Sequence, residues 1–158
     1  MSMVLNGIGI GLVATLAINL WALLLNRAAG MPLPNRAMMG RWAAHLTRGT
    51  VFHDSIATAQ PVTHETRIGW MFHICVGSTF GVMLAVLAGR DWLAAPTLWP
   101  ALIFGIVTVG FGWFLMLPGM GLGIAGAKTP NPLQVRLNGF LGHVVFGVAL
   151  WVGALLLA

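Results

Sequence analysis

Charged residues are scarce in this chain. Only 7% of its 158 residues are Asp, Glu, Lys or Arg, whereas a soluble domain usually carries about 25%. Eight basic and three acidic side chains cannot solvate the surface of a globule of this length, so a soluble globular domain is excluded. They also form no continuous basic stripe, which argues against nucleic acid as a partner.

Thiols and membrane-embedded carboxylates are lacking too. Cys75 is the single cysteine, so the chain can form neither an intrachain disulfide nor a CxxC metal site. The three acidic residues, Asp54, Glu65 and Asp91, all lie outside the long apolar segments. A carrier that moves protons or sodium ions on buried carboxylates is therefore disfavoured.

Long apolar runs make up most of the sequence, which is 58% hydrophobic. A helix that crosses a bilayer needs about 20 mostly apolar residues. Four segments meet this requirement, namely 4–25, 69–88, 98–117 (entered through Pro96 and left through Pro118) and 137–158. The sequence predicts a single all-α membrane domain, an up-down-up-down four-helix bundle with loops 26–68 and 118–136 on one side.

Basic residues are distributed unevenly between the two sides of this predicted bundle. Arg90 alone lies on the side of the termini, and the two longer loops carry Arg27, Arg36, Arg41, Arg48, Arg67, Lys128 and Arg136. The positive-inside rule then places these loops in the cytoplasm and both termini outside. The tryptophans fit two interfacial belts, with Trp21, Trp42, Trp70 and Trp113 on the inner side and Trp92, Trp99 and Trp151 on the outer side.

The first cytoplasmic loop is predicted to contain a short amphipathic helix over 36–48. Asn35 is a favourable N-cap, and Arg41, His45 and Arg48 recur at i, i+4 and i+7 on one face. This face would meet the anionic headgroups of the inner leaflet. The alternative is a plain connecting helix that packs on the bundle. Thr63 is expected to cap the second span, with Glu65 in its first turn.

Polar residues within the spans are the main functional candidates, because each needs a partner in the hydrocarbon region. His73, His143 and Asn19 lie roughly 9, 10 and 12 Å from the same membrane face at 1.5 Å per residue, and Asn138 is nearby in sequence. The two histidines at matched depth could ligate a metal ion or a haem iron. The alternatives are interhelical hydrogen bonds without further function, or a contact with a substrate.

The remaining histidines, His45, His53 and His64, follow no metal-binding spacing and are expected to be solvated in the loop. Glycines form a clearer pattern. Gly7 with Gly11, and Gly77 with Gly81, make GxxxG motifs in the first and second spans. Such faces allow close helix approach, either within the chain or in a homo-oligomer, and the sequence leaves both open.

Three stretches carry a resemblance to a known family: PNRAMMGRWAAH at 34–45, TLWPALIFGIVTVG at 97–110 and the loop 118–132, which ends in GIAGAKTPNP. With these, the chain resembles small four-helix bacterial inner-membrane proteins that are catalogued as a domain of unknown function. The resemblance extends over nearly the whole chain. It implies a bacterial integral membrane protein and assigns no catalytic residue.

Three functions follow as hypotheses. The leading one is a non-enzymatic membrane protein, either a small transport component or an accessory subunit, that acts as an oligomer. The second is a membrane redox protein that binds a metal or haem through His73 and His143. The third is a membrane enzyme or binder that acts on anionic lipids through Arg41, His45 and Arg48.

Overall fold

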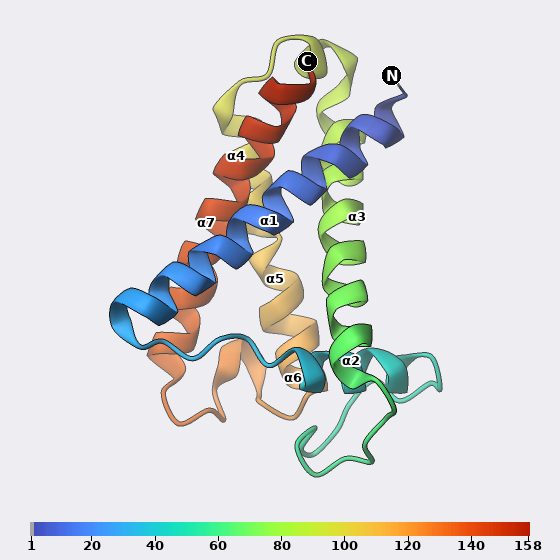
Figure 1. The fold of residues 1–158 in the computed structure, drawn as a ribbon, viewed down its shortest axis with the longest axis vertical. Coiled ribbons are helices and arrows are strands. Elements are labelled where there is room, and N and C mark those ends of the chain that lie inside the picture. Colours follow the sequence, from blue (N-terminus) through green and yellow to red (C-terminus); the bar gives the residue numbers. More distant parts are fainter. Residues whose placement is uncertain (1) are drawn as a thin grey trace. The chain divides into compact units, whose positions relative to one another are not determined.

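Long helices form at the four apolar segments. The computed structural model describes residues 2–158, and four of its helical segments are long and apolar enough to span a membrane. They are α1 (Met3–Ala29), α3 (Glu65–Ala94), the segment Leu98–Gly119 and α7 (Pro132–Leu157) (Figure 1). The third consists of α4 (Leu98–Val107), α5 (Val109–Phe111), the π-helical η1 (Gly112–Met116) and α6 (Leu117–Gly119). The all-α class and the four predicted spans are confirmed at this level.

Two shorter elements lie in the predicted loops, α2 (Arg36–Leu46) and the 3₁₀ turn η2 (Ile124–Gly126). The predicted cap forms at α2, where Asn35 Oδ1 accepts from the Met38 N–H at 3.0 Å. At the start of α7, Asn131 Oδ1 accepts from the Gln134 N–H at 3.2 Å in the same way. α3 begins at Glu65, so His64, rather than the predicted Thr63, immediately precedes its first turn.

The described helices group into two compact units, each assembled from separate stretches of sequence. Unit 1 contains the N-terminal segment to Leu33, Ile74–Thr108 and Phe140–Ala158. Unit 2 contains Pro34–His73 and Val109–Gly139. Helices α3 and α7 each contribute one part to either unit.

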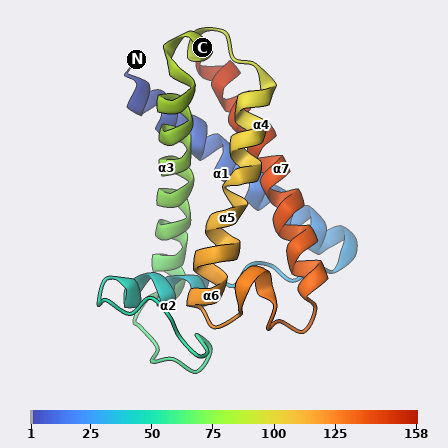
Figure 2. The same cartoon turned by 180° about the vertical axis from the view of Figure 1, so that it is seen from behind.

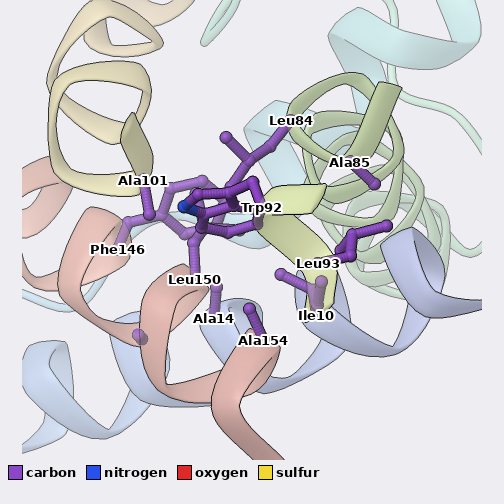
Figure 3. Close-up of a cluster of buried hydrophobic side chains, with 11 residues drawn as sticks. Ile10, Ala14, Leu84, Ala85, Trp92, Leu93, Ala101, Phe146, Leu150 and Ala154 are labelled. Atoms are coloured by element: carbon purple, nitrogen blue, oxygen red, sulfur yellow. The ribbon is translucent and has the colours of Figure 1, made fainter. Parts of the chain in front are cut away.

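Unit 1 packs α1, the later part of α3, α4 and the later part of α7 around one apolar cluster (Figure 3). Side chains that are at most 8% exposed form this cluster, namely Ile10, Ala14, Leu84, Ala85, Trp92, Leu93, Ala101, Phe146, Ala149, Leu150 and Ala154. Five of the eleven are alanine, so the helices approach each other closely.

The two GxxxG motifs face each other within unit 1. A Cβ on Gly7 would lie 2.5 Å from Val82 Cα, and one on Gly11 would lie 2.7 Å from Ser78 Cα. A Cβ on Gly81 would in turn meet the backbone of Gly7 and Gly11. The chain therefore uses these glycines for its own α1–α3 crossing.

Unit 2 packs α2 across the beginning of α3, beside α6 (Figure 2). Here Gly40 of α2 and Gly69 of α3 allow the crossing, because a Cβ on either would meet backbone atoms of the other helix. Trp42 is fully buried in an adjoining cluster with Met39, Ile56 and Met120. α2 is thus docked on protein along this face, as in the alternative of a connecting helix.

One predicted span end coincides with a break in the helix, and another does not. Gly89, with φ 83°, breaks α3 immediately after the predicted end of the second span at Ala88. The third span continues through Pro118 to Gly119, contrary to the expectation that Pro118 ends it. The Leu117 N–H bonds to Gly112 O in the π-helical register, so the change of register falls where Pro118 has no N–H to donate.

Two tryptophans that fit the predicted belts belong to protein cores instead. Trp42 has no exposed surface and donates from Nε1 to Val51 O at 2.9 Å. Trp92 is 8% exposed and donates to Thr97 O at 3.1 Å, while Trp151 donates to Pro96 O at 3.1 Å. The bonds of Trp92 and Trp151, both in unit 1, hold the connection between α3 and α4.

Ala125 has a left-handed backbone, with φ 49° and ψ 35°, in the turn before α7. We expect Ala125→Gly to raise the free energy of unfolding by up to about 1 kcal/mol, because glycine carries no Cβ penalty there. Ala127→Gly, at an ordinary φ of −59°, should lower it. Thermal unfolding in detergent would measure both, and equal losses in the two variants would contradict the assignment of strain to Ala125.

Candidate functional site

The α-helix of the third span is interrupted by a single residue, Thr108, between α4 and α5. Its backbone stays right-handed, with φ −66° and ψ −11°, and its N–H still donates to Phe104 O at 3.0 Å. Thr108 is 8% exposed and donates from Oγ1 to Gly105 O at 2.6 Å. The Nδ1 atom of His143, on α7, lies 3.1 Å from the same carbonyl and 3.0 Å from Thr108 Oγ1. A hydroxyl, an imidazole and a backbone carbonyl thus meet inside unit 1, in a predicted span.

These contacts determine the tautomer of His143. The Thr108 hydroxyl already donates its proton to Gly105 O, so His143 Nδ1 must carry a proton to approach either oxygen favourably. His143 Nε2 then carries the lone pair, which can accept a hydrogen bond or a proton, or coordinate a metal. The helices cross closely here, because a Cβ on Gly105 would lie 2.6 Å from Gly147 N.

The third span departs from α-helical geometry again after this point. Residues Gly112–Met116 form η1, which has the wider π-helical turn. Single π-turns within α-helices are rare and occur frequently at functional sites. Thr108 is the only hydroxyl residue in the apolar run 98–117, and this isolation is the sequence signal that marks it.

A second polar cluster, centred on Arg41, lies in unit 2. The Arg41 guanidinium donates to both carboxylate oxygens of Glu65, at 2.7 and 3.1 Å. Its Nη1 atom also donates to the carbonyls of Ile56, Ala57 and Ala59 at 2.9–3.1 Å. The two charged side chains are only 14% and 13% exposed. The hydrogen bonds to Glu65 hold the pKa of Arg41 above its ordinary value, so this cation persists throughout the neutral range.

The residues predicted to meet lipid headgroups are placed differently from one another. Arg41 binds protein groups, and His45 is 8% exposed with its ring against His53, so His45 is not solvated as expected for a loop histidine. Arg48 is exposed. Headgroup contact stays a prediction for this face, and Arg48 is the residue whose side chain is open to it.

The predicted intramembrane polar layer divides between the units. In unit 1, Asn19 donates to Thr15 O of its own helix at 2.7 Å, and His143 bonds to α4 as described. In unit 2, His73 lies edge-on to Trp70 at 6.3 Å between ring centroids, and Asn138 has polar or electrostatic contacts of its own. Within residues 2–158 the structure contains no group of three or more His, Cys, Asp or Glu placed to hold a metal ion. Ligation by His73 and His143 stays a prediction.

A family model described as "Protein of unknown function (DUF2938)" matches residues 8–157, which is nearly the whole chain. The chain belongs to the DUF2938 family. The resemblance read from residues 34–45, 97–110 and 118–132 is therefore confirmed at the level of a domain of unknown function. Comparison with curated proteins and with solved structures gave no match.

For this DUF2938 protein, sequence reasoning found His143 and Arg41 but missed their partners. Thr108 and Gly105 lie 35 and 38 positions from His143, and Glu65 lies 24 positions from Arg41. No local periodicity connects residues so far apart. The Arg41 cluster has a structural role, so the interruption at Thr108 is the better candidate for function.

Proposed function

We propose that this chain is a non-enzymatic multi-pass protein of the bacterial inner membrane that serves as a small transport component. The observation that carries the proposal is the buried polar contact in which Thr108 of the third span and His143 of α7 share the Gly105 carbonyl. Polar and ionisable side chains within spans are costly, and they often mark the path of a substrate or an ion. The third span supplies the carbonyl and the hydroxyl, and α7 supplies the imidazole, all within hydrogen-bond distance of each other.

The topology that goes with this proposal is an up-down-up-down bundle with both termini outside. Seven basic residues in the two longer loops against Arg90 in the short one support that orientation. Anionic headgroups would then face these loops. Four closely packed spans leave little room for a pore within one chain, so we propose a homo-oligomer as the transporting form.

Proton flux into liposomes tests the proposal, since His143 Nε2 is the group at the break that can take up a proton. The purified protein would be reconstituted with a pH-sensitive dye trapped inside, and a potassium diffusion potential would drive protons inwards. We expect faster acidification than in protein-free liposomes, and a rate that Thr108→Val and His143→Gln each lower about tenfold.

The matched control is Thr15→Val. Thr15 is also a buried threonine of unit 1, and its Oγ1 donates to Gly11 O at 2.7 Å, but α1 is uninterrupted there. The control should leave the flux within twofold of the wild type. Folded protein without flux above protein-free liposomes, or equal losses in Thr15→Val and Thr108→Val, would contradict a transport role for the interruption.

Absorption and metal analysis of the same purified protein would distinguish the metal or haem hypothesis from the transport proposal. His143 Nε2 is the atom that would bind such a group, because Nδ1 faces the carbonyl of Gly105. A visible absorption band or a stoichiometric metal, lost in His73→Ala and His143→Ala, would replace the transport proposal.

A further inference from the structure

The loop between α2 and α3 is fastened to the rest of unit 2 through two histidines. His45, on α2, places Nδ1 2.8 Å from Nε2 of His53. The other nitrogen of His53, Nδ1, lies 3.0 Å from Gly119 O at the end of α6. A continuous chain of hydrogen bonds therefore joins α2, residues 50–63 and α6.

The ring arrangement is that of a direct N–H···N bond. The ring centroids are 5.0 Å apart and the planes make an angle of only 26°. With a nitrogen–nitrogen distance of 2.8 Å, this places the rings edge to edge, because face-to-face stacking would bring the centroids closer together. One proton lies between the two nitrogens, so one ring must donate it and the other must accept it.

The carbonyl of Gly119 decides which ring donates. A carbonyl oxygen only accepts, so His53 Nδ1 must carry its proton to bond there. A neutral His53 then has its lone pair on Nε2, and His45 donates from Nδ1 to it. The reverse arrangement would set the lone pair of His53 Nδ1 against the Gly119 oxygen.

The same geometry limits how many protons the pair can hold. A first additional proton enters at His45 Nε2 and leaves both hydrogen bonds intact, because His45 still donates and His53 still accepts. A second one has to enter at His53 Nε2, where it would face the Nδ1–H of His45. The bond is then lost and two cations repel each other across a 5.0 Å centroid separation.

We propose that His45 and His53 form one proton-binding site that fastens residues 50–63 to α2 and α6 and releases them when both rings are protonated. Two backbone bonds would open with it, from His53 N–H to Gly119 O at 2.9 Å and from Ile56 N–H to Met120 O at 3.0 Å. Both connect the loop to the turn at the end of the third span.

Four charged side chains lie near the two histidines or next to them in sequence. On α2, Arg41 is paired with Glu65 of α3, and the Glu65 carboxylate lies near enough to interact electrostatically with His45. On the loop, Asp54 follows His53 and is exposed, and Arg48 of α2 is exposed as well. The segment 117–122 around Gly119 and Met120 contains no ionisable side chain.

Hydrogen–deuterium exchange of the full-length protein in detergent tests the proposal between pH 8 and pH 5. Rates for the peptide that covers 50–63 would be divided by the intrinsic rate at each pH. We expect the protection of this peptide to fall about tenfold as pH is lowered, because the second proton removes one connecting hydrogen bond. Constant protection in the wild type across this range would overturn the proposal.

Two variants separate this pair from other titrating groups. His45→Phe fills the buried position but leaves His53 able to donate to Gly119 O in both of its protonation states, so its protection should be lower and independent of pH. His64→Asn, at an exposed loop position with φ 62°, should keep the wild-type profile. A wild-type profile in His45→Phe, or a flat one in His64→Asn, would overturn the proposal. If His45→Phe does not fold, the pH dependence of protection in the wild type still tests the proposal.

Discussion

Gly11→Ala is expected to lower the free energy of unfolding by about 1–3 kcal/mol. The added Cβ would meet the Gly77 carbonyl and lie 2.7 Å from Ser78 Cα. Backbone atoms cannot rotate aside as a side chain would, so α1 and α3 must move apart. Titration with SDS in mixed micelles, followed by circular dichroism, measures the loss.

Gly142→Ala is the matched control on α7 in the same unit. Its added Cβ would lie 3.6 Å from Ile18 Cδ1, an ordinary van der Waals contact with a flexible side chain. The higher helix propensity of alanine should make this variant equal to the wild type or up to about 1 kcal/mol more stable. If Gly11→Ala were as stable as Gly142→Ala, the close α1–α3 crossing would be wrong.

Arg41→Ala is expected to destabilise unit 2 by roughly 2–3 kcal/mol. The substitution removes five hydrogen bonds to Glu65 and to the carbonyls of Ile56, Ala57 and Ala59, and it leaves a carboxylate that is 13% exposed without its cation. Arg41→Lys should recover part of the loss, because an ammonium group keeps the charge but cannot reproduce the planar fork.

Arg48→Ala is the control for this prediction. Arg48 lies just beyond the end of α2 and has an exposed side chain. Its truncation should change the free energy of unfolding by at most about 0.5 kcal/mol. Thermal unfolding and proteolysis within residues 50–63 would measure both variants. Equal stability of Arg41→Ala and Arg48→Ala would mean that the Arg41 cluster does not hold the loop.

The spans could be predicted because apolar length alone selects them in a chain with so few charges. The caps at Asn35 and Asn131 were predictable as well, since a cap depends on residues three positions apart. Amphipathic spacing also predicted α2. The spacing left open whether its charged face meets lipid headgroups or packs on the bundle, because the sequence does not show that Glu65 lies opposite Arg41.

The candidate site was less predictable because its hydrogen-bond partners are also distant in the sequence. His143 stands out as a polar residue in an apolar segment, but its partner atom is a backbone carbonyl, which every residue possesses. The continuation of the third span through Pro118 depends on a π-helical turn, and no residue type marks such a turn in advance. Tertiary hydrogen bonds of this kind need coordinates.

The interleaving of the two units along the chain has a consequence for synthesis. Ile10 and Leu150 share one core although about 140 positions separate them, and all of Val109–Gly139 is translated between two portions of unit 1. A nascent chain that leaves the ribosome stepwise therefore contains α1 and α3 before their last partner, α7, has been made. Such high contact order slows assembly and prolongs the exposure of incomplete intermediates. The incomplete core of unit 1 is therefore most open to proteolysis in the interval before α7 is made.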